Sequence, residues 1–461
     1  MKGILNKHFT SRQVVAVELF SAGWCNLSCK YCYIPKTDFL KEVHRGIIQS
    51  IEDGTFINDI KELYGSDLES ISHWGTEPTL TIRKFKKFYE EIAKAFPKFK
   101  ECKVSSNFMT NPNNLVEWVT EILPKDRSLQ IDIQVSLDGP PFITDKNRVG
   151  GSTDQIVKNC LKVTSEINRI GTNHKVSMHL KPTICVDDIY ELAKFDRCLE
   201  YYEFFDDFMT KWIESNNNDV VNLSKACDPT LVFPGTYTSE DGKMFYKLLQ
   251  NQLELKKRKW KVVSPESNYY WRFRQKFNYY RELYIKPRMF VCSAGDSCFA
   301  LGDKEGFSHI CHQSFYLDHE GYFDEAKKYG KLDEQTVEGM EKGRINIIKD
   351  NYIKHKDDVI GLIKMTYNTR AYNDFMTHKA STIIALILEE AECGHIDPCF
   401  KDLEVARIFA YFMQVAECPM HNLAITGSKL VGISSLIKLF GNGVFQNIFR
   451  QMIRDEEYIN E

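Results

Sequence analysis

The sequence predicts an α/β fold built on a partial (β/α)6, TIM-like barrel. Between residues 14 and 216, short β-branched or apolar runs alternate with longer amphipathic stretches, as expected for repeated βα units around a parallel sheet. One of these runs, residues 129–137, alternates strictly between apolar and polar residues, so one face of that strand would be polar. Because strands covered on both faces are usually apolar throughout, this pattern predicts a lumen that holds a ligand.

The expected elements follow in order along this region. Six strands are expected, at residues 14–20, 68–74, 103–108, 129–137, 175–183 and 208–213. Helices are expected between them, at residues 41–52, 82–96, 114–123, 153–169 and 186–205. The fifth strand repeats the alternation of the fourth, and its polar side chains would be Ser177, His179 and Lys181. In closed βα barrels the chemistry lies at the C-terminal ends of the strands, so polar residues there are the candidates for function.

The length of 461 residues predicts two or three domains. We expect an N-terminal extension (1–13), the barrel (14–216), a connector (217–289) with a helix near 237–249, and a C-terminal domain (290–461) with a helical insertion at about 332–390.

Composition and charge exclude several classes of protein. A formal net charge of -3 offers no general surface for polyanions, so no nucleic-acid partner is expected. No apolar run reaches the roughly 20 residues of a membrane span, and the N-terminal residues do not resemble a secretory signal. We therefore expect a cytoplasmic protein, in which clustered cysteines are metal ligands before they are disulfides.

The first predicted strand is followed by three closely spaced cysteines, Cys25, Cys29 and Cys32, in a CxxxCxxC run. Iron–sulfur clusters are normally held by four thiolates, so three of them leave one coordination position for another ligand. A zinc site is the alternative, with His44 as a fourth ligand, because four N or S ligands are the rule for zinc. A purely structural role for these cysteines is also open.

This stretch resembles the signature of the radical S-adenosylmethionine (SAM) superfamily, in which an aromatic residue, here Tyr31, precedes the last cysteine. The resemblance implies a [4Fe-4S] cluster whose open iron takes the amino and carboxylate groups of SAM. It also implies reductive cleavage of SAM to a 5′-deoxyadenosyl radical, with an electron donor such as flavodoxin or ferredoxin as a partner.

Four residues after the second predicted strand resemble the family's Gly-Gly-Glu-Pro motif, which binds the SAM ammonium: Gly75, Thr76, Glu77 and Pro78. Thr76 departs from the pattern, because it replaces the second glycine. The alternative is a strand-to-helix turn with Thr79 or Thr81 as its N-cap.

Ser106 and Asn107, at the end of the third predicted strand, resemble a polar segment that lines the SAM site in related enzymes. By this resemblance Asn107 is a SAM-site residue. The alternative is that Asn107 closes the strand as an Asx turn.

Residues 136–140, Ser-Leu-Asp-Gly-Pro, with a downstream arginine, resemble a segment of the peptide-modifying branch that includes anaerobic sulfatase maturases and other peptide maturases. The resemblance implies that Ser136 and Arg148 hold the SAM carboxylate, a task suited to a hydroxyl and a guanidinium fork. Asp138 lies on the same polar face as Ser136 and joins the set of cofactor-binding candidates. A plain turn is the alternative.

Six cysteines lie near the C-terminus: Cys292, Cys298, Cys311, Cys393, Cys399 and Cys418. The first three resemble the opening of a SPASM or twitch domain, which implies a small α+β domain with at least one auxiliary [4Fe-4S] cluster. Six thiolates cannot fill two four-thiolate clusters, so we expect one complete cluster that uses one of the last three. For these last three, buried free cysteine is the alternative.

Together these resemblances imply a radical SAM enzyme that abstracts a hydrogen atom from a peptide, leading to a cross-link or an oxidation. Residues 1–13 are too few for a fused leader-recognition domain, so a separate leader-binding protein is a candidate partner. His312, His179 and Lys181 are the candidates for the residue that handles a proton. Two other hypotheses stay open: a radical SAM enzyme that acts on a small metabolite, and a non-catalytic Fe-S scaffold or electron-transfer protein.

Overall fold

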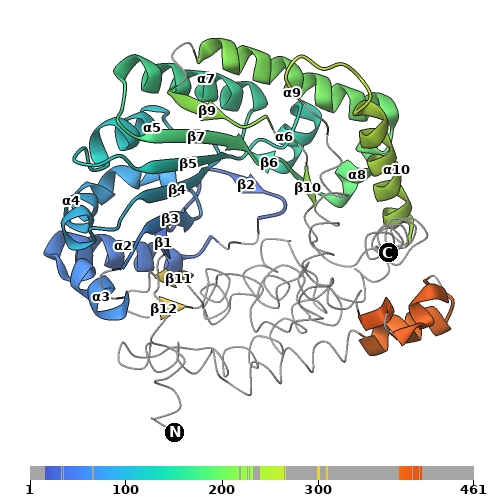
Figure 1. The fold of residues 1–461 in the computed structure, drawn as a ribbon, viewed down its shortest axis with the longest axis horizontal. Helices are drawn as coiled ribbons and strands as arrows, with labels where there is room; N and C mark the ends of the chain where they lie inside the picture. Colours follow the sequence, from blue (N-terminus) through green and yellow to red (C-terminus); the bar gives the residue numbers. More distant parts are fainter. Residues whose placement is uncertain are drawn as a thin grey trace, which may run out of the picture.

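A twisted sheet that is parallel except at one edge organises the part of the chain that the computed structural model describes, with helices packed against its outer face (Figure 1). The described residues are 16–263, 265, 298–301, 308–309 and 384–407, without residues 33, 35, 65–66, 217–219, 226, 228, 232–238, 397 and 404. The strand order is β12-β11-β1-β3-β4-β5-β7-β9. The bounds are β1 (Ala16–Ala22), β3 (Ser70–Gly75), β4 (Glu101–Ser106), β5 (Gln130–Val135), β7 (Lys175–Leu180), β9 (Val221–Leu223), β11 (Cys298–Leu301) and β12 (Ser308–His309).

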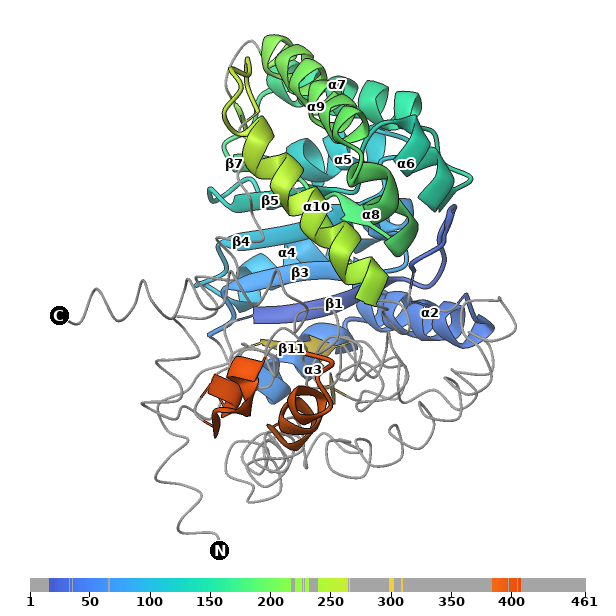
Figure 2. The same cartoon turned by 90° about the vertical axis from the view of Figure 1, so that its right-hand side faces the viewer.

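Six of these strands, from β1 to β9, are neighbours in the order of the sequence and pair in parallel. Figure 2 shows β1, β3, β4, β5 and β7 side by side in one curved layer. Sequential parallel strands joined by helices form one open sheet, so the predicted α/β class is confirmed, whereas the partial (β/α)6 barrel stays a prediction. The auxiliary domain expected at 290–461 lies largely outside the described residues.

The helices cover the outer face of the sheet. The longer ones are α2 (Asp38–Asp53), α3 (Thr55–Tyr64), α4 (Lys86–Ala95), α7 (Thr153–Ile170), α9 (Phe195–Ser215) and α10 (Ser239–Leu255). Shorter ones are α5 (Asn113–Glu117), which continues into the π-helical turn η3 (Trp118–Ile122), α6 (Pro141–Asn147), α8 (Val186–Leu192), and the 3-10 turns η1 (Pro78–Leu80), η2 (Ile82–Phe85) and η4 (Pro398–Lys401). Within the described residues, no helix is both long and apolar enough to span a membrane.

Local sequence signals set the helix boundaries. The Thr37 hydroxyl accepts a hydrogen bond from the Leu40 N–H at 3.2 Å and so caps the first turn of α2. The same helix ends at Gly54, which adopts a left-handed φ of 81° that a side chain would disfavour. Ser152 caps α7 in the same way as Thr37, through the Gln155 N–H.

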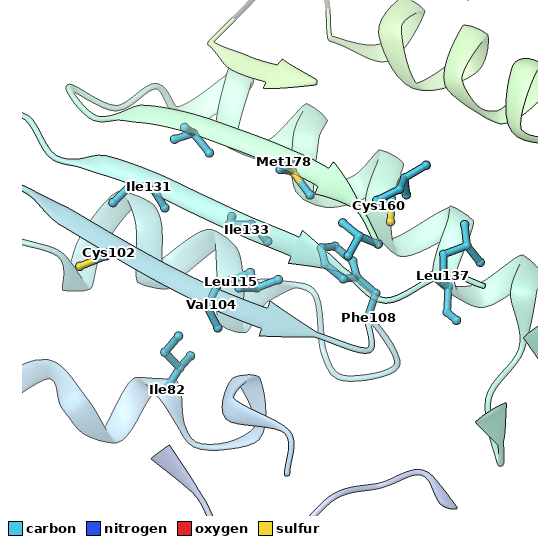
Figure 3. Packing of buried hydrophobic residues seen from close by; sticks show 14 of the residues in the cluster. Ile82, Cys102, Val104, Phe108, Leu115, Ile131, Ile133, Leu137, Cys160 and Met178 are labelled. Carbon is cyan, nitrogen blue, oxygen red and sulfur yellow. The ribbon is translucent and has the colours of Figure 1, made fainter. Parts of the chain in front are cut away.

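The core lies between the sheet and the helices. Ile131 and Ile133 of β5 point outward with Val104 of β4 and Met178 of β7, and they pack against helical residues such as Leu115 (Figure 3). Each of these side chains is 2% exposed or less, and burying one of this size contributes about 1.5–3 kcal/mol. Since the apolar side chains of each alternating strand face outward, the polar side chains of that strand must face the inner side of the sheet.

The expected sixth strand, residues 208–213, is wrong. These residues lie within α9, where buried Phe205, Phe208, Met209 and Trp212 recur at the spacing of one helix face. The sixth strand of the sheet is β9, which lies beyond residue 216. An aromatic-rich run of six residues fits both the period of a strand and the period of a helix. The longer helical pattern around it shows that these residues belong to a helix.

Two short sheets complete the inner side. β2 (Ser28–Cys29) pairs antiparallel with β6 (Arg148–Val149), and β8 (Thr183–Ile184) pairs in parallel with β10 (Thr230–Leu231). Beyond β1, the strand β11 adds to the sheet in parallel, with the backbone of Cys298 opposite Ala16. Residues 298–301 therefore extend the barrel sheet.

Candidate active site

The cysteine loop, residues 23–32, leaves the C-terminal end of β1 and crosses the open end of the barrel (Figure 1). It is tied to the segment after α6, because Cys29 pairs with Arg148 across the β2–β6 bridge. The Lys30 N–H also donates to the Asn147 carbonyl at 2.8 Å. Two regions singled out by the sequence, the cysteine run and the residues downstream of Asp138, are thus in contact.

The three thiols of the loop have different surroundings. Cys25 Sγ accepts the Leu27 N–H at 3.3 Å and the Asn107 Nδ2–H at 3.6 Å. Cys32 Sγ instead donates to the Ile34 carbonyl at 3.6 Å. Burial raises the pKa of the free Cys25 thiol to about 11 and that of Cys29 to about 12, although the Arg148 cation opposes the shift at Cys29.

Glu77 is a buried carboxylate at the start of η1. Its Oε1 accepts the Thr79 N–H at 3.3 Å and the Thr79 hydroxyl, and its Oε2 accepts the Asn107 N–H at 2.8 Å. Burial is the main cause that raises its pKa, and these hydrogen bonds oppose the shift. Glu77 forms no ion pair with a cationic side chain among the described residues.

The turn around Glu77 corrects one alternative from the sequence. Glu77 caps η1 through its side chain, whereas Thr81 occupies the N-cap position of η2 without a capping hydrogen bond and its hydroxyl donates to the carbonyl of Ser21. Gly75 has a φ of 126°, and a Cβ there would lie 2.6 Å from the Ala22 carbonyl oxygen. Only glycine fits where β3 passes this close to β1.

Asn107 follows β4 and connects Glu77 to the cysteine loop. Its Oδ1 accepts the Met109 N–H at 2.8 Å, so the expected Asx turn is present. Its Nδ2 reaches both Cys25 Sγ and the Asn26 Oδ1, the latter at 2.8 Å. The turn and the proximity to the candidate site therefore occur together.

Asp138 and Arg148 form a buried ion pair on the other side of the loop. Arg148 Nη2 donates to Asp138 Oδ1 at 2.8 Å, and the Tyr31 hydroxyl donates to Oδ2 at 2.7 Å. The Thr183 N–H also donates to Oδ1, at 3.0 Å. The Arg148 guanidinium lies 5.5 Å from the centre of the Tyr31 ring, so the aromatic residue of the cysteine motif belongs to this cluster.

Arg148 retains an unused donor. Its Nε is buried and has no hydrogen-bond partner within the described part of the chain. An orphaned buried donor normally marks a group that a ligand, an ion or a water satisfies. Ser136 lies nearby in the chain, half-buried at the end of β5, with its N–H donating to the Ser106 carbonyl at 2.9 Å.

The donor set suits an Fe-S cluster. Three half-buried thiols lie on one loop, and one of them accepts two N–H groups, as a metal-bound thiolate does. In the described residues, no group of three or more His, Cys, Asp or Glu side chains is placed around a single metal ion.

The zinc alternative relied on His44, whose buried ring packs against Trp24 at a centroid distance of 5.1 Å and has no hydrogen-bond partner among these residues.

Polar residues line the inner face of the sheet below this site. One row of them is in register across five strands and consists of Glu18, Ser72, Lys103, Asp132 and Ser177. His179 Nδ1 lies 2.9 Å from Asp132 Oδ1, and Ser177 Oγ donates to the same oxygen at 3.3 Å. His179 thus lies on this lumen wall, as expected, whereas Lys181 is exposed at the end of β7.

The remaining candidates lie outside the described residues or apart from this site. Cys292, Cys311, His312 and Cys418 fall outside the described residues, and only the backbone of Cys298 is described. Cys393 is exposed after a helix at 384–392, and Cys399 is half-buried in η4. Their assignment as metal ligands stays a prediction.

The structure also shows residues that the sequence interpretation missed. Asn26 lies inside the cysteine run, and its polar side chain there could have indicated a role at the site. Asp132 becomes notable only through its contact with His179 on the next strand, which requires the register of the sheet.

The chain has weak similarity to several solved structures. Among solved structures, the chain is 13% identical to "Native anSMEcpe with bound AdoMet", with a TM-score of 0.35 over 78% of this chain and 98% of that one. The structure described as "Native anSMEcpe with bound AdoMet and Cp18Cys peptide" gives 14% identity and a TM-score of 0.36, again over 78% of this chain and 98% of that one. Streptococcus suis SuiB bound to precursor peptide SuiA gives 14% identity and a TM-score of 0.36, over 67% of this chain and 62% of that one.

Global similarities of this size carry no argument about activity, and a comparison with curated proteins gives no match. The family comparison is specific: residues 19–195 match the model of the radical SAM superfamily. This match spans the cysteine loop, Glu77, Asn107 and the Asp138–Arg148 pair. Residues 19–195 are therefore a radical SAM domain.

Proposed function

We propose that this chain cleaves SAM reductively at a [4Fe-4S] cluster held by Cys25, Cys29 and Cys32, and that it abstracts a hydrogen atom from a peptide. The supporting observation is that one three-thiol loop contacts Asn107, which is hydrogen-bonded to Glu77, on one side and pairs with Arg148 on the other. The bound cluster and SAM would supply the electron and the 5′-deoxyadenosyl radical, whereas the protein binds and orients them.

Glu77 is suited to hold the SAM ammonium. An ionised carboxylate offers about four acceptor positions, and the donors of Thr79, Asn107 and Ser106 that use them are all neutral groups. A buried carboxylate is costly unless a cation compensates it, and none of the described side chains supplies one. A ligand ammonium would supply the missing charge.

Arg148 is suited to hold the SAM carboxylate. Asp138 occupies Nη2 and fixes the guanidinium plane, while Nε remains buried without a partner in the described part of the chain. A carboxylate would satisfy this donor through a charge-assisted hydrogen bond. Ser136, at the end of β5, is the second candidate for this contact.

The peptide substrate is the less direct part of the proposal. It is supported by residues 136–140, which resemble the peptide-modifying branch, and by the half-exposed polar row of the lumen wall. We extend the proposal to at least one auxiliary [4Fe-4S] cluster within residues 290–461, with Cys292, Cys298 and Cys311 as ligands. A scaffold or electron-transfer protein would not need Glu77 or Arg148 poised beside the thiols.

Anaerobic reconstitution with SAM and a strong reductant tests the proposal. We expect 5′-deoxyadenosine, and iron of about eight per chain for two [4Fe-4S] clusters. A Cys25→Ala, Cys29→Ala, Cys32→Ala variant should form no 5′-deoxyadenosine, while Cys198→Ala, a buried thiol in α9, should behave like the wild type. Wild-type product no higher than that of the triple variant would contradict SAM cleavage, and iron near four would contradict the auxiliary cluster.

The substrate class needs a separate measurement. Short peptides encoded beside the gene should increase the yield of 5′-deoxyadenosine and should themselves lose hydrogen, as measured by mass spectrometry. Stimulation by small metabolites alone would favour the alternative substrate class.

A further inference from the structure

We infer that the Asn107 side chain donates a hydrogen bond to the Cys25 ligand sulfur and thereby raises the reduction potential of the cluster. This inference rests on the proposed function, because it requires the cluster at Cys25, Cys29 and Cys32. It assigns Asn107 a role toward the cluster in addition to lining the SAM site, and it makes Asn107 a positioning and tuning residue.

The geometry fixes which end of the amide faces the sulfur. Oδ1 of Asn107 accepts the Met109 N–H at 2.8 Å, so the opposite, Nδ2 end must be the donor. One Nδ2 hydrogen is directed to Asn26 Oδ1 at 2.8 Å and the other to Cys25 Sγ at 3.6 Å. The main-chain N–H is held by Glu77, so the residue is fixed at three points before any cluster binds.

The contact with sulfur is not needed for the fold of the turn. The Asx turn uses only Oδ1, and a serine hydroxyl would serve the same purpose. The next residue, Phe108, has a φ of 54° although it is bulky and buried. Such a conformation is costly and occurs where the surroundings impose it, often at functional sites.

The other two cysteines show what this contact adds. Cys25 Sγ accepts hydrogen bonds from two N–H groups. By contrast, Cys32 Sγ donates to a carbonyl, and Cys29 lies near the Arg148 charge. Hydrogen bonds to cluster sulfurs stabilise the reduced, more negative state and are among the factors that set the potential. Removing the donor from residue 107 should therefore make reduction harder.

The test is an EPR-monitored redox titration of the reconstituted protein without substrate. The signal of the SAM-binding cluster is identified as the one that changes when SAM is added. Asn107→Ser keeps an acceptor for the Met109 N–H but removes the donor. We expect its reduction constant to fall about threefold, which corresponds to about 30 mV at 59 mV per tenfold.

Two further variants calibrate this shift. Asn107→Asp is isosteric but places a carboxylate beside the sulfur, so it should shift the potential further in the same direction. Asn111→Ser is the matched control, because Asn111 closes a similar turn through Asn113 and is exposed. It should leave the potential unchanged. A potential of Asn107→Ser equal to that of the wild type, at equal iron content, would overturn the inference.

A measurement on the wild type covers the case in which the variants fail to load iron. Pulsed EPR on protein labelled with side-chain ¹⁵N asparagine should show a nitrogen coupled to the reduced cluster, and no coupling would overturn the inference. The two failures are distinguishable: a wild type with no SAM-sensitive cluster signal rejects the proposed function, whereas a normal signal without coupling or shift rejects only the role of Asn107.

Discussion

The open end of the barrel and its lumen wall are built in different ways, although they share the same strands. At the open end, Glu77 and Asp138 are 2% and 0% exposed, and protein donors surround both carboxylates. On the lumen wall, the paired Asp132 and His179 side chains are 36% and 34% exposed. Groups that must hold one cofactor geometry are preorganised by burial, whereas a half-exposed wall can adapt to a larger substrate.

The two buried carboxylates at the open end also differ from each other. Asp138 already has a cation, Arg148, and it holds together the cysteine loop, β8 and the segment after α6. Glu77 has comparable burial without a cation among the described residues. Asp138 therefore acts as structural support within the proposed site, and Glu77 is the acid that we propose binds a positively charged ligand.

The largest effect should come from breaking the Asp138–Arg148 pair. Asp138→Asn leaves the Arg148 charge buried and uncompensated, so we expect the free energy of unfolding to fall by about 3–5 kcal/mol. Urea denaturation of the cluster-free protein measures this loss. The double variant Asp138→Leu, Arg148→Met should lose less than the single variant, because no charge is stranded.

The corresponding change on the lumen wall is the reference for that loss. Asp132→Asn removes a half-exposed carboxylate from His179, a contact that is an ion pair only when His179 is protonated, so a loss of at most about 1 kcal/mol is expected. Equal losses for the two variants would contradict the distinction between a buried support and an adaptable wall.

A smaller effect should follow from the close approach of β3 to β1. Gly75→Ala places a methyl group 2.6 Å from the Ala22 carbonyl oxygen at a φ of 126°, and strained backbone of this kind costs about 1–3 kcal/mol before the clash is added. Gly171→Ala is the matched control, because Gly171 also has a positive φ, 80°, but no atom lies within 4 Å of its added Cβ. Thermal unfolding should show a greater loss at Gly75, and equal losses would argue against the close contact.

Five of the expected strands were predictable because short β-branched or apolar runs recur between amphipathic stretches, and in β4, β5 and β7 the burial also alternates with a period of two. The cysteine loop was predictable because its three thiols are local in sequence. Residues 208–213 misled the prediction because an aromatic run buried on one face of a helix also resembles a short strand. The contacts of Asn107 with Cys25 and of Asp132 with His179 join distant segments, and they depend on register and loop docking that no local pattern encodes.

The smallest predicted effect is the pH dependence of the lumen wall. Burial raises the pKa of Asp132, but hydrogen bonds from His179 and Ser177 outweigh this and leave it below the ordinary value of 3.8. A carboxyl whose pKa is lowered on folding stabilises the protein above its unfolded pKa, and this contribution is lost as the pH falls through the folded pKa.

The free energy of unfolding of the wild type should therefore exceed that of Asp132→Asn by at most about 1 kcal/mol near neutral pH. The difference should shrink as the pH falls below 3.8. Urea denaturation of both proteins across this range measures it. Ser177→Ala is a second variant, which removes the hydrogen bonds of Ser177 to Asp132 and to the Ile131 carbonyl and keeps the contact of Asp132 with His179. A difference that does not shrink below pH 3.8 would mean that His179 and Ser177 do not lower the pKa of Asp132, and the lumen wall would then resemble the open end of the barrel.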